Sequence, residues 1–314
     1  MPTVFRWNIA RREQLGRLVD GEPADVGADL TRELRLCCGR VIAMAGDARL
    51  VFIGRSPEHL YDYLTGALAS TSWSTRLTLL NLSLKEGGAD WRQPDSAAYA
   101  FLREQFAAAR LSPREIAASP RPIAFVDLIY AGETFGKLTE FLIAWTTDAH
   151  VDWRAVRRRI RIVGVTERQH DGYRTWRWRT LDWASLYRPS SLKGVSIPWW
   201  FWSHLGNSEK KVSRENSPAR WGDPEMLRPP RGDGVKDALR VAVRLHDLGH
   251  SRAERDAIAA ILAAQPSFRN AWCRTLAAEL RAASRPKRIE RTFGSKQRVR
   301  SWRRHVGSTP SGRR

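Results

Sequence analysis

The sequence predicts an α/β fold, in which a parallel sheet carries helices on both faces. Short apolar runs alternate along the chain with longer segments of helical periodicity, and within the runs polar and apolar residues do not alternate. Strands of a parallel sheet are covered on both faces, so they appear as continuous apolar runs, and the connecting helices produce the alternation. The 314 residues, 42% of them hydrophobic, are enough to bury such a core.

The predicted elements follow one another in a regular order. Each strand is a short apolar run that stops at a glycine or a polar residue. The strands are expected over residues 49–53, 76–82, 123–126 and 160–165. Each helix repeats apolar residues at spacings of three and four. The helices between the strands are expected over residues 28–45 and 58–69, from residue 95 to about 109, and over residues 134–145.

The character of the chain changes after residue 167. Residues 173–179 alternate tryptophan or tyrosine with arginine and threonine, which predicts a further strand. Three amphipathic helices are expected near the C-terminus, over residues 235–248, 252–264 and 267–283. We therefore divide the chain into an α/β domain, a Trp/Arg-rich insert region, a helical module, and a basic tail expected to be disordered. These segments are residues 1–167, 168–234, 235–283 and 284–314.

The net charge of +20 indicates a polyanionic partner. Residues 285–314 hold eleven Arg or Lys and one acid, a net of +10, so half of the excess lies there. Two interpretations stay open for this tail: a solvated segment or a nucleic-acid-binding one. Elsewhere, the candidate nucleic-acid contacts are arginines beside tryptophans and on the last predicted helix, which would be the reading helix of a helix-turn-helix-like unit. They are Arg177, Arg179, Arg269 and Arg274.

The cysteines and the N-terminus favour a cytoplasmic protein. Cys37, Cys38 and Cys273 are odd in number and two are adjacent, which is a poor disulfide framework, and no CxxC pair is present. The first ten residues lack the apolar core of a signal peptide, and no run of about 18 apolar residues occurs. We expect no membrane association.

The most informative stretch follows the third predicted strand. The apolar run stops at Asp127, and a loop of small residues leads into a helix near Thr134. Such a loop offers backbone N–H groups and the Thr134 hydroxyl to an anion at the helix start. The stretch Gly54-Arg55-Ser56-Pro57 follows the first strand, so both loops are expected at the carboxyl edge of one sheet.

The loop after the third strand resembles the phosphoribosyl-pyrophosphate (PRPP) motif of type I phosphoribosyltransferases. In that family an apolar strand ends in two acids, followed by two variable residues, small or hydroxyl residues, Gly, any residue and Thr. The matching stretch here runs from Val126 to Thr134, and Val126 stands where the family has its first acid. The resemblance covers roughly residues 28–167 and implies a phosphoribosyltransferase-like fold.

The resemblance also implies roles for individual residues. Asp127 would hold the ribose hydroxyls and, through PRPP, help to place the cofactor Mg²⁺. Tyr130 occupies a position that is an acidic base in some members, and we take it with Asp127 as a catalytic candidate. The 5′-phosphate would lie against Ala131, Gly132, Glu133 and Thr134. The pyrophosphate would lie against Gly54, Arg55 and Ser56.

The implied function is binding of PRPP or a related nucleotide. An active enzyme would transfer the 5-phosphoribosyl group and release pyrophosphate. The missing acid and the basic tail favour, by analogy, a specialised regulatory or bacterial defence role over general salvage. The alternative is a non-enzymatic nucleic-acid-binding protein that uses the same scaffold.

A second motif, His246-Asp247 followed by His250, resembles the His-Asp core of HD-type metal phosphohydrolases. That family also needs a later Asp, and none follows Asp256. We therefore favour a helix C-terminus, with the histidines near the last carbonyls and Gly249 as the cap.

Overall fold

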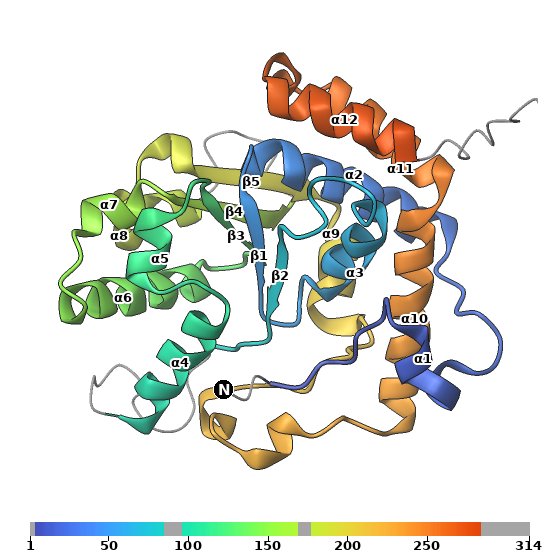
Figure 1. Ribbon diagram of the computed structural model, residues 1–314, viewed down its shortest axis with the longest axis horizontal. Coiled ribbons are helices and arrows are strands. Elements are labelled where there is room, and N and C mark those ends of the chain that lie inside the picture. The colour runs from blue at the N-terminus through green and yellow to red at the C-terminus, as the bar shows by residue number, and fades with distance from the viewer. Residues whose placement is uncertain (1–3, 85–95, 169–176, 284–314) are drawn as a thin grey trace, which may run out of the picture.

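The computed structural model describes residues 4–84, 96–168 and 177–283. These residues form a five-stranded, fully parallel sheet in the order β2-β1-β3-β4-β5, which confirms the predicted α/β class (Figure 1). The strands are β1 Arg49–Ile53, β2 Leu77–Leu80, β3 Ile123–Leu128, β4 Ile160–Glu167 and β5 Leu192–Ile197.

Alternate residues of each strand enter two separate cores. Leu50 and Phe52 of β1 face one core, whereas Val51 and Ile53 face the other. The first core is covered by α2 Ala28–Ala45, α3 Glu58–Ala67, α9 Trp199–Ser203 and three C-terminal helices. The second is covered by α4 Ala97–Ala108, α5 Pro113–Ala118, α6 Glu133–Asp148, α7 Trp153–Arg157 and α8 Asp182–Ser185. Helices therefore cover both faces, as the sequence predicts.

The fifth strand was not predicted. β5 pairs in parallel with β4, from Leu192 opposite Ile162 to Ile197 opposite Glu167. The sheet thus extends into the Trp/Arg-rich region, which the sequence analysis had separated from the α/β domain. β5 escapes detection because Lys193 and Ser196 interrupt its apolar run, which an edge strand tolerates.

The strand predicted over residues 173–179 is wrong where it can be compared. Arg177–Thr180 form a 3₁₀ helix, η2, and residues 173–176 lie outside the described part of the chain. Trp178 is buried in the core beneath α6. Among the described residues of this stretch, the buried tryptophan therefore lies in a helical turn and not in a strand.

Three C-terminal helices are present, as predicted: α10 Asp233–His250, α11 Arg252–Ala263 and α12 Ala271–Ala283. α10 packs against α3 and α11 against α2, so these helices share the first core with the sheet. The last helix starts later than predicted, because Pro266–Arg269 form a 3₁₀ turn and Asn270 is extended. The basic tail from residue 284 lies outside the described residues.

The prediction that Gly249 caps α10 is wrong. The helix continues to His250 and its C-cap is Ser251. An alanine Cβ at Gly249 would lie 2.1 Å from the Tyr63 carbonyl oxygen of α3, and one at Gly66 would lie 1.9 Å from the His246 carbonyl oxygen of α10. The two helices therefore touch backbone to backbone, which requires glycine at both positions.

Cys37, Cys38 and Cys273 are free thiols buried in the first core. Burial raises the pKa of Cys37 to about 12, so this thiol stays protonated. Among the described helices, none combines the length and the apolar character needed to cross a membrane.

Candidate functional site

The loops after β1 and β3 meet at the carboxyl edge of the sheet. They line two adjoining cavities, of about 160 and 370 Å³, which share Ser56, Asp127, Thr134 and Gly206. β1 and β3 are neighbours in the sheet, and the strand order reverses between them. Open α/β sheets bind their ligands at such a reversal. The smaller cavity includes Gly54 and Arg55, and the larger one includes residues 128–135.

Gly132 gives the second loop its shape. Its φ is +83°, a left-handed conformation that strongly favours glycine, and it is the N-cap of α6. A Cβ there would also lie 3.1 Å from the Trp178 Cβ, because the loop rests on η2. The first N–H groups of α6 have no acceptor within the helix, and Glu133, Thr134 and Phe135 line the larger cavity. This end of α6 favours a bound anion.

Asp127 is the buried acid of the site. Its side chain is nearly inaccessible, and its Oδ1 accepts a hydrogen bond of 2.7 Å from the Leu128 N–H. Burial raises the pKa of Asp127 to about 8, while Leu128, Thr134 and Lys211 lower it only in part. The carboxyl group is therefore largely protonated at neutral pH. The preceding residue, Val126, faces the opposite core, so the motif brings one acid to the site.

Two cations line the smaller cavity in different ways. The Lys211 ammonium donates to the carbonyl oxygens of Arg55 at 3.2 Å and Leu205 at 2.7 Å, and it lies 3.1 Å from the Glu209 carboxylate. Its two hydrogen bonds to main-chain oxygens and its ion pair with Glu209 tie the loop after β1 in place. Arg55 keeps a third of its side chain exposed and lies 3.8 Å from Glu215. Arg55 is the better placed of the two to meet a ligand.

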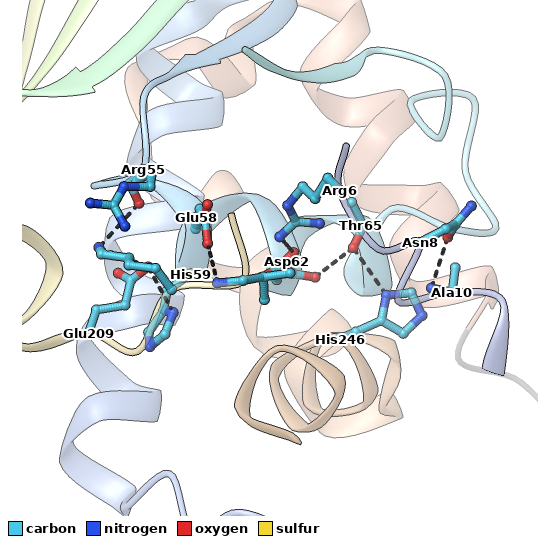
Figure 2. A network of polar contacts seen from close by, with 12 residues as sticks. Arg6, Asn8, Ala10, Arg55, Glu58, His59, Asp62, Thr65, Glu209 and His246 are labelled. Atoms are coloured by element: carbon cyan, nitrogen blue, oxygen red, sulfur yellow. Dashed lines mark hydrogen bonds and ion pairs between the residues drawn. The ribbon is translucent and has the colours of Figure 1, made fainter. Parts of the chain in front are cut away.

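A buried polar network lies behind that loop, at the start of α3 (Figure 2). The Glu58 carboxylate accepts from the Val212 N–H at 3.0 Å, and the His59 Nδ1 lies 3.2 Å from Glu209. Burial lowers the pKa of His59 to about 4, so the ring is neutral. Arg6 pairs with Asp62 at 2.6 Å. The network fixes the segment carrying Lys211 against α3.

Tyr130, the second catalytic candidate, lies on the rim of the larger cavity. Its side chain is 85% exposed, and its ring centroid is 6.0 Å from that of Trp202. A ligand in the cavity could reach it, but nothing described holds the hydroxyl in place. Its catalytic role stays a prediction.

The four nucleic-acid candidates do not form one surface. Arg177 and Arg179 belong to η2, beside the core of the α6 face, whereas Arg269 and Arg274 belong to the α12 region on the opposite face. The Arg274 guanidinium donates to the carbonyl oxygens of Phe268 and Arg269. Its predicted contact with nucleic acid therefore competes with a structural role.

The histidines of α10 serve helix packing. His246 Nδ1 lies 3.1 Å from the Thr65 hydroxyl of α3, and His250 Nδ1 lies 3.0 Å from the Arg255 guanidinium. Asp247 pairs with Arg12. Among the described residues, no group of three or more His, Cys, Asp or Glu side chains could hold a metal ion. His246 and His250 therefore lie at the C-terminal end of α10 and make packing contacts, as the structural interpretation expects, whereas Gly249 does not end the helix and Asp247 is ion-paired.

The site also contains residues that sequence reasoning did not place there. Asn81 follows β2, and Gly206, Lys211 and Asn216 come from the segment after α9. No motif marks these residues: Asn81 lies near the end of the strand predicted over residues 76–82, and the other three reach the site through the path of the segment after α9. Comparison with family models, with curated proteins and with solved structures finds no match to the chain.

Proposed function

We propose that the carboxyl edge of the sheet binds PRPP, or a closely related ribose phosphate or nucleotide, together with Mg²⁺. The observation that carries the proposal is the meeting of the two loops: Asp127 and Thr134 share one cavity with Gly54, Arg55 and Ser56. The first turn of α6 and Thr134 would hold the 5′-phosphate, and Asp127 the ribose hydroxyls. Arg55 and Ser56 would hold the pyrophosphate.

The side chains at this edge suit a hard cation. Asp127, Ser56 and Thr134 offer oxygen atoms, which Mg²⁺ prefers, and Mg²⁺ usually keeps several waters and binds phosphate oxygens as well. Asp127 with the ligand's own oxygens would hold the ion, which would neutralise charge on the pyrophosphate. This arrangement needs Asp127 in its ionised form.

The proposal is confined to binding of the ligand, and its Mg²⁺-dependent part is expected to strengthen as pH rises and Asp127 ionises. Phosphoribosyl transfer develops positive charge at the anomeric carbon, which an ionised carboxylate stabilises. Burial holds the pKa of Asp127 at about 8, so the ionised form dominates only above that pH. Transfer, if the protein performs it, requires ionisation of Asp127, so its rate is expected to rise with pH through about 8 and to level off above that pH.

Thermal unfolding with and without Mg²⁺·PRPP tests the proposal. Ligand at about 100 times its Kd stabilises the folded state by about 2.7 kcal/mol, a readily measured shift in Tm. Thr134→Val keeps the side-chain shape but loses the hydroxyl, so its shift is expected to be smaller. Thr147→Val is the matched control, because Thr147 lies on the same helix with its hydroxyl bonded to the Ile143 carbonyl. An unshifted wild-type Tm would refute the proposal.

Arg55→Ala is expected to weaken binding of the pyrophosphate end of the ligand and to leave binding of the ribose-phosphate end unchanged. If Arg55 holds the pyrophosphate, the variant loses about tenfold in affinity for PRPP, or about 1.4 kcal/mol. Its affinity for ribose 5-phosphate stays unchanged, because that ligand has no pyrophosphate. Calorimetric titration measures the affinity for each ligand. An equal loss of affinity for both ligands would show that Arg55 does not hold the pyrophosphate.

A further inference from the structure

Two side-chain amides, Asn81 and Asn216, lie in the smaller cavity beside Asp127. The Asn81 Nδ2 donates to the Arg214 carbonyl oxygen at 2.9 Å, and the Asn216 Nδ2 donates to the Asn81 carbonyl oxygen at 2.8 Å. Because each nitrogen is held by a main-chain acceptor, the orientation of each amide is fixed. We call these two residues the amide pair.

Both oxygens of the amide pair are buried acceptors. Among the described residues, neither Oδ1 has a hydrogen-bond partner, although Asn216 is only 1% exposed. Leaving such a group unsatisfied costs about 1–3 kcal/mol, and the large majority of buried polar side-chain atoms have a partner. Two unsatisfied acceptors in one cavity therefore call for hydrogen-bond donors that the described residues do not supply.

The surrounding contacts hold the amide pair rigidly. The Asn216 carbonyl oxygen accepts from the Ser83 N–H at 2.9 Å and from the Trp221 Nε1 at 3.1 Å. Asn216 is thus tied by its main chain to the segment after β2 and by its side chain to Asn81. A site of this rigidity binds without paying the cost of ordering its own side chains.

We propose that the amide pair binds a neutral hydrogen-bond donor of the ligand, a hydroxyl or an amino group, beside the phosphate held by α6. This inference rests on the proposed function and adds to it that the ligand must carry a neutral hydrogen-bond donor beside its phosphate. Carboxamide oxygens accept N–H and O–H groups and offer nothing to a fully ionised oxyanion. The pair therefore selects sugar phosphates and nucleotides over inorganic anions of the same charge.

The test compares three probes by titration. Sulfate carries no donor, ribose 5-phosphate carries hydroxyl donors, and AMP adds an amino group. Asn81→Ala and Asn216→Ala are each expected to lose about tenfold in affinity for ribose 5-phosphate, or about 1.4 kcal/mol, and to bind sulfate like the wild type. A loss seen with AMP alone would identify the amino group as the donor. Asn270→Ala is the control, because Asn270 lies beyond α11, next to α12.

The outcomes separate the inference from the proposed function. Wild-type binding of the organic probes that neither amide variant weakens would overturn the inference alone. An equal loss of affinity for sulfate would also overturn the inference, because the substitutions would then affect the anion site. If the wild type binds neither PRPP nor any probe, both proposals are wrong. Tm is measured for each variant, and Asn81→Ala carries the test if Asn216→Ala does not fold.

Discussion

Gly249→Ala is expected to destabilise the protein by about 3 kcal/mol, the upper end of what overpacking commonly costs. The added Cβ would lie 2.1 Å from the Tyr63 carbonyl oxygen and 3.0 Å from the Ala67 nitrogen. Both are backbone atoms of α3, so no side-chain rotation relieves the clash. The helices must move apart, and this opens the first core where α10 covers it.

Gly234→Ala on the same helix is the matched control. Nothing lies within 4 Å of a Cβ at Gly234, so this variant keeps or gains stability, by up to about 1 kcal/mol from helix propensity. Urea unfolding of both variants gives the two free energies of unfolding. If Gly249→Ala proved as stable as Gly234→Ala, the backbone contact between α3 and α10 would be refuted.

Asp127→Asn is expected to stabilise the protein increasingly as pH rises. The pKa of Asp127 is about 8 in the folded protein against 3.8 for an ordinary aspartate, so the folded state holds an extra proton between these values. Wild-type stability from this group is complete below about pH 4 and is lost as pH rises to 8. Asparagine cannot ionise, so the variant avoids the loss, which is on the order of a few kcal/mol.

Urea unfolding of wild type and variant at pH 5, 7 and 9 measures this difference. Asp237→Asn serves as a control of opposite sign, because the exposed Asp237 carboxylate has its pKa lowered by Lys210. The stability that this group contributes is complete above its unfolded pKa of about 3.8, so its replacement is expected to cost the same stability at pH 5, 7 and 9. A wild-type to Asp127→Asn difference that does not change between pH 5 and 9 would show that Asp127 is not desolvated.

The fold could be predicted largely because its central strands are buried on both faces. β1 and β3 appear as unbroken apolar runs, and the bounds of α2 agree with the predicted residues 28–45. Prediction failed where tertiary contacts override local signals. β5 is interrupted by polar residues at the sheet edge, and Gly249 looks like a helix cap although it lies inside α10 for packing.

The candidate site could be predicted only in part. The loops carrying Arg55 and Asp127 follow directly from strands, and parallel strands bring such loops to one edge. Asn216 and Lys211 reach the same cavity through an irregular segment, whose path no sequence pattern specifies. The raised pKa of Asp127 could not be predicted from the sequence either, because it depends on how deeply the folded chain buries the carboxyl group.

Calorimetric titration of Mg²⁺·PRPP into wild type and Asp127→Asn, at moderate salt and near pH 8, tests the account most directly. We predict saturable binding to the wild type and a loss of about tenfold to a hundredfold in the variant, since a hydrogen bond to a charged group is worth about 1.5–3 kcal/mol. Asp256→Asn on α11 should bind like the wild type. Equal binding by wild type and Asp127→Asn would contradict the assignment of Asp127 as the ribose ligand.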